Sequence, residues 1–128
     1  MEKETIINYL GNYPEVIYDG INRDISGPEY IKGRETLLNA TDEIQKCIFW
    51  LVEFYKPNKS FKNLKNSLQL KFYVEKYFGQ YISNGSFITA VKILGYDYRE
   101  VQEDICIYLS FNKVHLRRYR EKYFRSDL

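Results

Sequence analysis

Residues 67–111 read SLQLKFYVEKYF (67–78), GQYI (79–82), SNGSFITAVKIL (83–94) and GYDYREVQEDICIYLSF (95–111). This pattern predicts a helix, a short turn, a second helix and a β-hairpin. Ser83 is a typical N-cap, because its hydroxyl can accept a hydrogen bond from a free N–H of the first turn. Ile82 and Phe87 form a hydrophobic staple around the cap, and Gly95 stands where a left-handed residue ends the helix.

The first helix of this pair is predicted to start at the cap Ser67, to bury Leu68, Phe72, Val74, Tyr77 and Phe78, and to stop at Gly79. After the second helix, apolar residues alternate with others over 105–111, which indicates a strand with one buried face. Helix, turn, helix and hairpin is the order of a winged helix-turn-helix. A plain corner between two helices is the alternative explanation of the two helices.

Polar residues of the second helix are spaced for one stripe. Ser86, Thr89 and Lys92 lie three positions apart and therefore on one side of a helix. If this helix enters a DNA major groove, we expect that stripe and Asn84 to lie nearest to the bases.

The same region resembles a known signature. Ser67-x-x-Leu-Lys-x-x-Val-Glu75, then Tyr81-Ile-Ser-Asn-Gly-x-Phe-Ile-x-Ala90, then Gly95-Tyr96 is similar to a pattern in small uncharacterised proteins of bacteriophages and mobile elements. This chain departs from the pattern at Leu68, Gln69 and Phe72. The resemblance covers about the middle third of the chain. It implies a phage-like setting and no particular activity.

The whole chain is predicted to be one mainly α (α+β) domain, as expected for its length. Residues 1–57 would be helical support, 67–111 the helix-turn-helix unit with its hairpin, and 113–125 a basic last helix. The support is predicted to contain a helix at about 3–10 and a long helix at about 34–55. Between them, residues 12–33 read as irregular.

Charge is unevenly distributed along the chain. Residues 1–55 hold ten acidic and five basic residues, a net charge of −5. Because the whole chain has a net charge of +2, the remaining residues carry +7. Such asymmetry favours an acidic partner for the basic part. The residues expected to contact phosphates are Lys59, Lys62, Lys65, Arg117, Arg118, Arg120 and Arg125. An acidic hairpin tip, with four acids against Arg99 over residues 97–104, opposes this expectation.

No residue cluster indicates a reaction, and neither a cofactor nor a metal site is predicted. The chain has one histidine, His115, and no Cys or His pair with zinc spacing. Glu29 and Lys32, with Asp19 upstream, loosely resemble the charged residues of metal-dependent nucleases, but their spacing is loose. Cys47 and Cys106 are expected to be free thiols, with a disulfide between them as the minority alternative.

We therefore expect a non-enzymatic accessory protein that binds nucleic acid, most simply duplex DNA. The alternative is a module that docks on or inhibits a host or element-encoded protein. Its 13 tyrosines are compatible with a protein interface. A folded core unit of a larger assembly also remains open. No small-molecule substrate is expected. No apolar stretch is long enough for a membrane span, and the first residues do not form a signal peptide, so a cytoplasmic location is expected.

Overall fold

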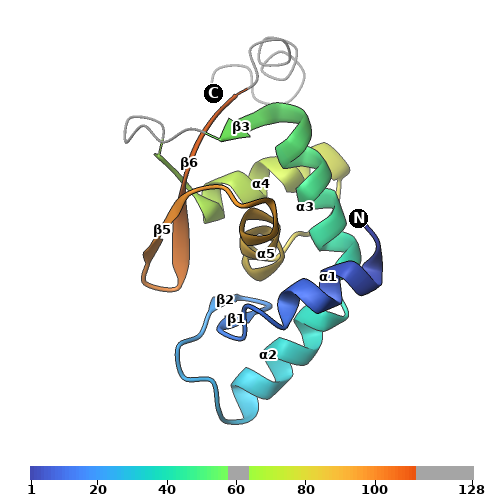
Figure 1. The fold of residues 1–128 in the computed structure, drawn as a ribbon, viewed down its shortest axis with the longest axis vertical. Helices are drawn as coiled ribbons and strands as arrows, with labels where there is room; N and C mark the ends of the chain where they lie inside the picture. The colour runs from blue at the N-terminus through green and yellow to red at the C-terminus, as the bar shows by residue number, and fades with distance from the viewer. Residues whose placement is uncertain (58–63, 112–128) are drawn as a thin grey trace.

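The computed structural model describes residues 1–57 and 64–111. Within these ranges the chain forms a small α+β arrangement of five helices and two antiparallel sheets (Figure 1). The elements are α1 Lys3–Leu10, β1 Val16–Ile17, β2 Gly20–Ile21, α2 Pro28–Leu38, α3 Thr41–Phe54, β3 Tyr55–Pro57, β4 Leu64–Asn66, α4 Ser67–Phe78, α5 Asn84–Leu94, β5 Tyr98–Val101 and β6 Asp104–Phe111.

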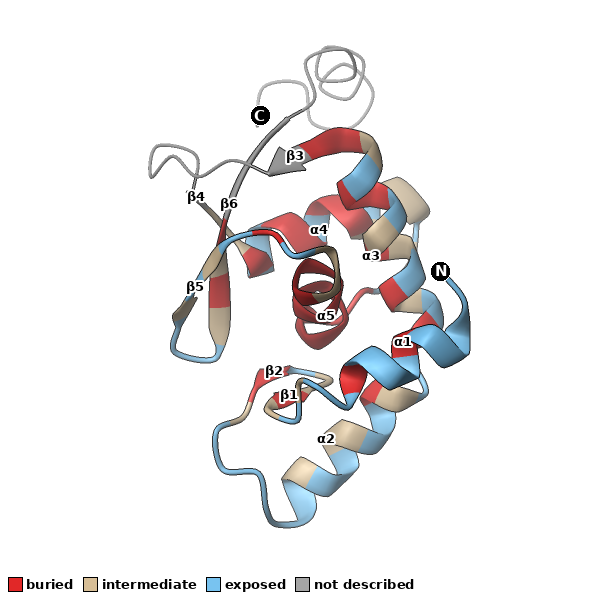
Figure 2. Ribbon diagram, viewed as in Figure 1, coloured by how far each residue is buried: buried red, intermediate tan, exposed pale blue. Residues whose placement is uncertain are grey.

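Helix α5 lies at the centre of the core. Its apolar residues Phe87, Ile88 and Val91 are fully buried. On α3, Trp50 lies with its ring 6.4 Å from that of Phe87, and the neighbouring Leu51 is also fully buried. Figure 2 shows α5 almost wholly in the colour of buried residues. The core is therefore assembled around the helix that the sequence places second in the predicted pair.

Strand β6 joins the four strands of the larger sheet. It pairs antiparallel with β5 through residues 104–107, with β4 through 106–108 and with β3 through 109–111. The smaller sheet is the β1–β2 hairpin near the N-terminus, with Val16 opposite Ile21. The hairpin lies beside the start of α5 and between that helix and α2 (Figure 1).

Several predicted helix ends are confirmed. Helix α1 has the predicted bounds. Ser83 caps α5, since its side chain accepts from the Ser86 N–H, and Gly95 ends the helix in the left-handed region with φ 75°. The predicted strand at 105–111 is confirmed, one residue longer at its start.

The predicted long helix over 34–55 is wrong, because two helices, α2 and α3, occupy that region. Helix α2 starts at Pro28, whose fixed φ suits the first helical position. It ends at Leu38 with Asn39 as its C-cap, and Ala40 is the N-cap of α3. Helical periodicity continues across this break, so apolar spacing alone does not show it.

Two expectations for α4 are also wrong. The cap is Asn66, whose side chain accepts from the Leu68 N–H at 2.8 Å, and not Ser67. The predicted burial of Leu68 and Phe72 is wrong, since they are 38% and 56% exposed, whereas Val74 is buried as predicted, together with Leu70.

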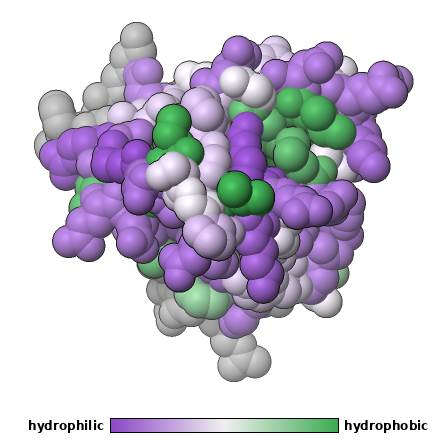
Figure 3. Space-filling model, turned by 90° about the horizontal axis from the view of Figure 1, so that it is seen from below, coloured by the Kyte–Doolittle hydropathy of each residue, from purple (hydrophilic) through white to green (hydrophobic). Residues whose placement is uncertain are grey.

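The surface seen from the end that carries α2 and the β1–β2 hairpin is mainly hydrophilic, with hydrophobic groups interspersed (Figure 3). Among the helices of residues 1–57 and 64–111, none combines the length and the apolar character that crossing a bilayer requires. Cys47 and Cys106 are both free thiols.

Candidate functional site

The four residues expected nearest to DNA bases lie inside the protein. Asn84, Ser86, Thr89 and Lys92 are 3%, 0%, 0% and 9% exposed. Reading a base edge in the major groove requires side chains that protrude from the helix. The structure therefore does not present this stripe to a groove, because α3, β5 and the N-terminal segments cover it.

Glu43 of α3 binds the start of α5. Its Oε1 accepts from the Ser83 N–H at 2.9 Å and from the Ser86 hydroxyl at 3.1 Å, while Oε2 accepts from the Tyr18 hydroxyl at 2.8 Å. Burial and this hydrogen bond raise the pKa of Tyr18. A carboxylate at a helix N-terminus is also favoured by the helix dipole. Ser86 therefore has a structural role in anchoring α5.

Asn84 and Gly85, at the start of α5, hydrogen-bond to two different hairpins, β5–β6 and β1–β2. The Asn84 amide donates to Asp104 at 2.7 Å, and the Gly85 N–H donates to the Tyr18 carbonyl at 2.9 Å. A Cβ at Gly85 would lie 1.9 Å from the Ile17 carbonyl oxygen, so only glycine permits this approach. The Ser-Asn-Gly block of the resemblance thus forms a junction between α5, the β1–β2 hairpin and β6.

Lys92 forms a buried ionic cluster. Its Nζ lies 3.1 Å from Glu15, 4.0 Å from Glu100 and 2.6 Å from the Tyr98 hydroxyl. Burial lowers the pKa of Lys92, but the hydrogen bonds to Tyr98 and Glu15 outweigh it, and the net pKa is raised. The Lys92 ammonium therefore makes its contacts inside the protein, where it connects the loop that contains Glu15 to Tyr98 and Glu100 of β5.

Of the residues expected to contact phosphates, Lys65 is described, and it is partly exposed on β4 opposite Ile107. The others, Lys59, Lys62, Arg117, Arg118, Arg120 and Arg125, lie outside the described residues, as does the helix predicted at 113–125.

Two basic segments, residues 58–63 and 112–128, connect to the larger sheet close to the end of β6. Residues 58–63 follow Pro57, which pairs with Leu109, and precede Leu64, which pairs with Tyr108. Residues 112–128 follow Phe111 directly. All three points of attachment therefore lie along the last four residues of β6.

Two exposed aromatic rings flank a buried lysine on α4. The Lys71 Nζ lies 4.4 Å from the centre of the Phe72 ring and 4.7 Å from that of Tyr81. The two ring centres are consequently no more than 9.1 Å apart. Lys71 is 6% exposed and pairs with Glu75 at 2.9 Å, whereas Phe72 and Tyr81 are 56% and 59% exposed. Neither ring was predicted from the sequence to lie on the surface, although the spacing from Leu68 to Phe72 is that of a second helical stripe.

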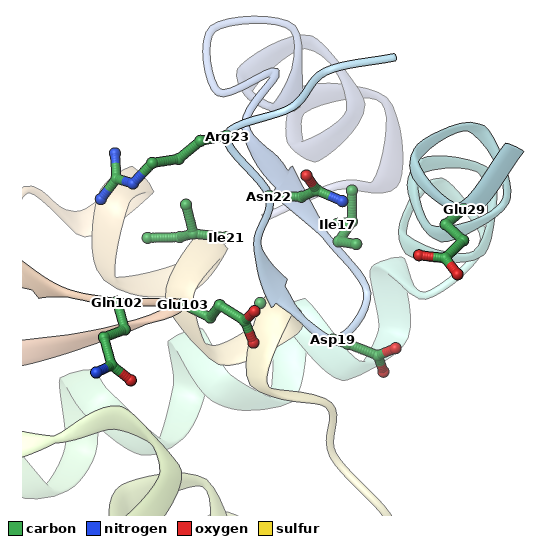
Figure 4. A pocket seen from close by; sticks show the side chains of 9 residues that line it. Ile17, Asp19, Ile21, Asn22, Arg23, Glu29, Gln102 and Glu103 are labelled. Atoms are coloured by element: carbon green, nitrogen blue, oxygen red, sulfur yellow. The ribbon is translucent and has the colours of Figure 1, made fainter. Parts of the chain in front are cut away.

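A cavity of about 480 Å³ lies between the β1–β2 hairpin, the start of α2 and the β5–β6 turn. Asp19, Glu29 and Glu103 line it, and Figure 4 shows their carboxylates. Asp19 and Glu29 also line a second cavity, of about 500 Å³, together with Lys32. The structure thus gathers the three residues that loosely resemble a nuclease set. In the part of the chain that the structure describes, however, no group of three or more His, Cys, Asp or Glu is placed to hold a metal ion.

Comparison of this chain with models of protein families, with curated proteins and with solved structures found no match.

Proposed function

We propose that the protein binds nucleic acid without enzymatic activity, by holding the phosphate backbone at the end of the larger sheet where β6 ends. The observation that supports this is the attachment of both basic segments to the last four residues of β6. Residues assigned to phosphate contacts are Lys59, Lys62, Lys65, Arg117, Arg118, Arg120 and Arg125.

The distribution of charge supports the same end. Residues 1–57 and 64–111 hold eleven basic and fifteen acidic residues, a net charge of −4. Residues 58–63 and 112–128 hold eight basic and two acidic residues, a net charge of +6. Neutralising phosphates releases counterions and supplies most of the affinity in sequence-independent binding. A molecule polarised in this way would approach a nucleic acid with the end of β6 first.

The acidic hairpin tip does not oppose this orientation. It lies at the start of β6, where Val101 pairs with Asp104, and Leu109 is five residues further along the strand. Five residues of a strand span about 17 Å. Because the Debye length is about 8 Å at physiological salt, repulsion between the tip and a phosphate at the other end would be largely screened.

In this proposal α4, α5, β5 and β6 follow one another in the predicted order, but α5 has a structural role and does not read bases. Contacts to phosphates position a protein but carry no sequence information. The binding we propose is therefore independent of sequence. A phage or mobile-element setting, which the resemblance implies, is part of the same proposal.

A protein-docking module is the second candidate, and one surface favours it. Phe49 and Val52 of α3 are 50% and 61% exposed. The Phe49 ring packs 6.3 Å from Tyr77 and 6.2 Å from Phe78 of α4. Exposed aromatic groups of this kind are enriched at the centres of protein interfaces.

The test is a fluorescence titration of labelled duplexes and single strands at two salt concentrations. The Arg117→Glu/Arg118→Glu variant should bind more weakly to all sequences alike. The control is Lys3→Glu/Lys32→Glu, which changes the net charge equally at two exposed positions in α1 and α2. For the wild type, log affinity should fall with log salt by about 0.9 per neutralised phosphate on duplex DNA.

Two results would contradict the proposal. The first is an absence of binding to either nucleic acid at low salt, which would leave the protein-docking candidate ahead. The second is an equal loss in the control variant, which would show that overall charge matters and the end of β6 does not.

A further inference from the structure

The exposed rings of Phe72 and Tyr81 form a pair with unusual surroundings. Both are more than half exposed, and both lie within 5 Å of one lysine ammonium that is itself buried and paired with Glu75. Aromatic rings of this size normally bury a large apolar area. Here Lys71 makes cation–π contacts with both rings, and the Tyr81 ring also lies 6.3 Å from that of Tyr18, yet more than half of each side chain is exposed.

The chemistry of such a pair suits nucleobases. Bases of a single strand have open faces, and proteins bind them by stacking aromatic side chains on those faces beside a basic groove. In a duplex the bases are stacked on one another and the same faces are covered. Two rings no more than 9.1 Å apart are close enough to engage bases of one short stretch of strand.

We propose that Phe72 and Tyr81 form a base-stacking site for single-stranded nucleic acid. This inference rests on the function proposed above and names the preferred ligand class. The phosphates of the strand would be held at the end of β6 and its bases would extend over the exposed face of α4.

The location of the rings fits that path. Helix α4 begins directly after β4, which carries Lys65 and follows the basic segment 58–63. From Tyr55 to Val74 the chain holds five lysines and no acidic residue. Phe72 is the sixth residue of α4, one helical turn beyond the exposed Leu68. A strand that leaves the basic end would thus reach Phe72 without meeting an acidic residue of this segment, and the first acidic residue beyond it, Glu75, is paired with Lys71.

Phe49 provides a matched control. Its ring is 50% exposed on α3 but packs against Tyr77 and Phe78 instead of a lysine. If any exposed aromatic group supported binding, replacing Phe49 would have the same effect as replacing Phe72. If the proposed site is specific, only the changes on α4 and at Tyr81 will matter.

The experiment compares Phe72→Leu, Tyr81→Leu and Phe49→Leu in titrations with labelled oligothymidine and with a labelled duplex. Leucine keeps an apolar side chain and removes the flat ring, so a loss reports stacking and not simple burial. Each of the first two variants should weaken oligothymidine binding about tenfold and leave duplex binding unchanged. Phe49→Leu should change neither.

A second measurement does not depend on comparing affinities. Trp50, the chain's one tryptophan, is fully buried. In Phe72→Trp the new tryptophan is exposed, so a ligand that touches the surface can quench its fluorescence but not that of Trp50. Its emission should be quenched by oligothymidine and not by the duplex.

The outcomes separate the two proposals. If the wild type binds oligothymidine and the Leu variants at Phe72 and Tyr81 bind equally well, the stacking site is refuted while nucleic-acid binding stands. Equal losses on oligothymidine and duplex would also refute it, as would quenching by both. If the wild type binds neither ligand, the proposed function fails and the stacking site fails with it.

Discussion

Replacing Gly85 by alanine should destabilise the protein although the substitution lies within a helix. The added Cβ would meet the Ile17 carbonyl oxygen at 1.9 Å and the Tyr18 carbonyl oxygen at 2.7 Å, whereas ordinary contacts begin at 3.4 Å. The β1–β2 hairpin must therefore move by about 1.5 Å. Such a movement breaks the bond of 2.9 Å between the Gly85 N–H and the Tyr18 carbonyl.

The expected change in the free energy of unfolding combines two destabilising contributions and one that offsets them. Overpacking of a rigid backbone contact costs about 1–3 kcal/mol, and a lost hydrogen bond costs about 1 kcal/mol. The higher helix propensity of alanine offsets up to about 1 kcal/mol. We expect a net loss of about 1–3 kcal/mol in the free energy of unfolding, which lowers the melting temperature by roughly 4–11 °C for a chain of this size.

Urea unfolding followed by circular dichroism measures this loss. Gly11→Ala is the control, because Gly11 has an ordinary helical φ of −59° and a Cβ there would lie 3.3 Å from the Asn8 carbonyl oxygen, a slightly tight contact that a shift of about 0.1 Å relieves. That variant should stay within about 0.5 kcal/mol of the wild type. If Gly85→Ala matched this control, the hairpin would not be seated on α5 and the assigned role of the Ser-Asn-Gly block would be refuted.

Three further results are expected from the same unfolding assay. Gly95→Ala should cost about 1 kcal/mol, because a left-handed φ of 75° is strained for alanine although the space around the position is open; no loss would contradict the assigned helix end. Glu43→Gln should cost about 1–3 kcal/mol, since a charged acceptor of three hydrogen bonds becomes neutral; a neutral result would show that Glu43 does not anchor α5. Stability should fall at alkaline pH, because burial raises the pKa values of the Cys47 thiol and the Tyr96 hydroxyl above their ordinary 9.0 and 10.0. The unfolded state then loses these protons first, and the contribution present below pH 9 is lost as pH rises through the folded pKa values; urea midpoints that did not fall between neutral and alkaline pH would refute this.

Local signals predicted the helix ends well and the helix environments poorly. Ser83 and Gly95 act through backbone groups within a few residues, so their roles can be read from neighbouring sequence. In the sequence Ser86 and Lys92 look like part of a solvent-facing stripe. Their partners Glu43 and Glu15 are 43 and 77 positions away, so the neighbouring sequence does not indicate that they are buried. Only the tertiary structure shows that these polar side chains are satisfied in the interior.

For the candidate site too, local features could be predicted from the sequence and tertiary ones could not. The basic composition of the segments around β6 was evident from the sequence, but their common point of attachment depends on the pairing of β3 and β4 with one strand. On α4, Leu68 and Phe72 form one apolar stripe and Leu70 and Val74 another. Periodicity does not determine which of two such stripes faces the core, and the prediction took Leu68 and Phe72 from the exposed stripe and Val74 from the buried one.

The pairing of β6 also has a consequence for the order of assembly during synthesis. Strands β3, β4 and β5 each pair with β6, and in the described part of the chain with no other strand. Tyr55 of β3 precedes its partner Phe111 by 56 positions, and contacts so distant in sequence form slowly. On the ribosome, β3 and β4 emerge well before β6 and expose unpaired backbone groups that can pair with other chains. We therefore expect pausing of translation before residue 104 to promote aggregation, and a supplied peptide with the sequence of residues 104–111 to suppress it.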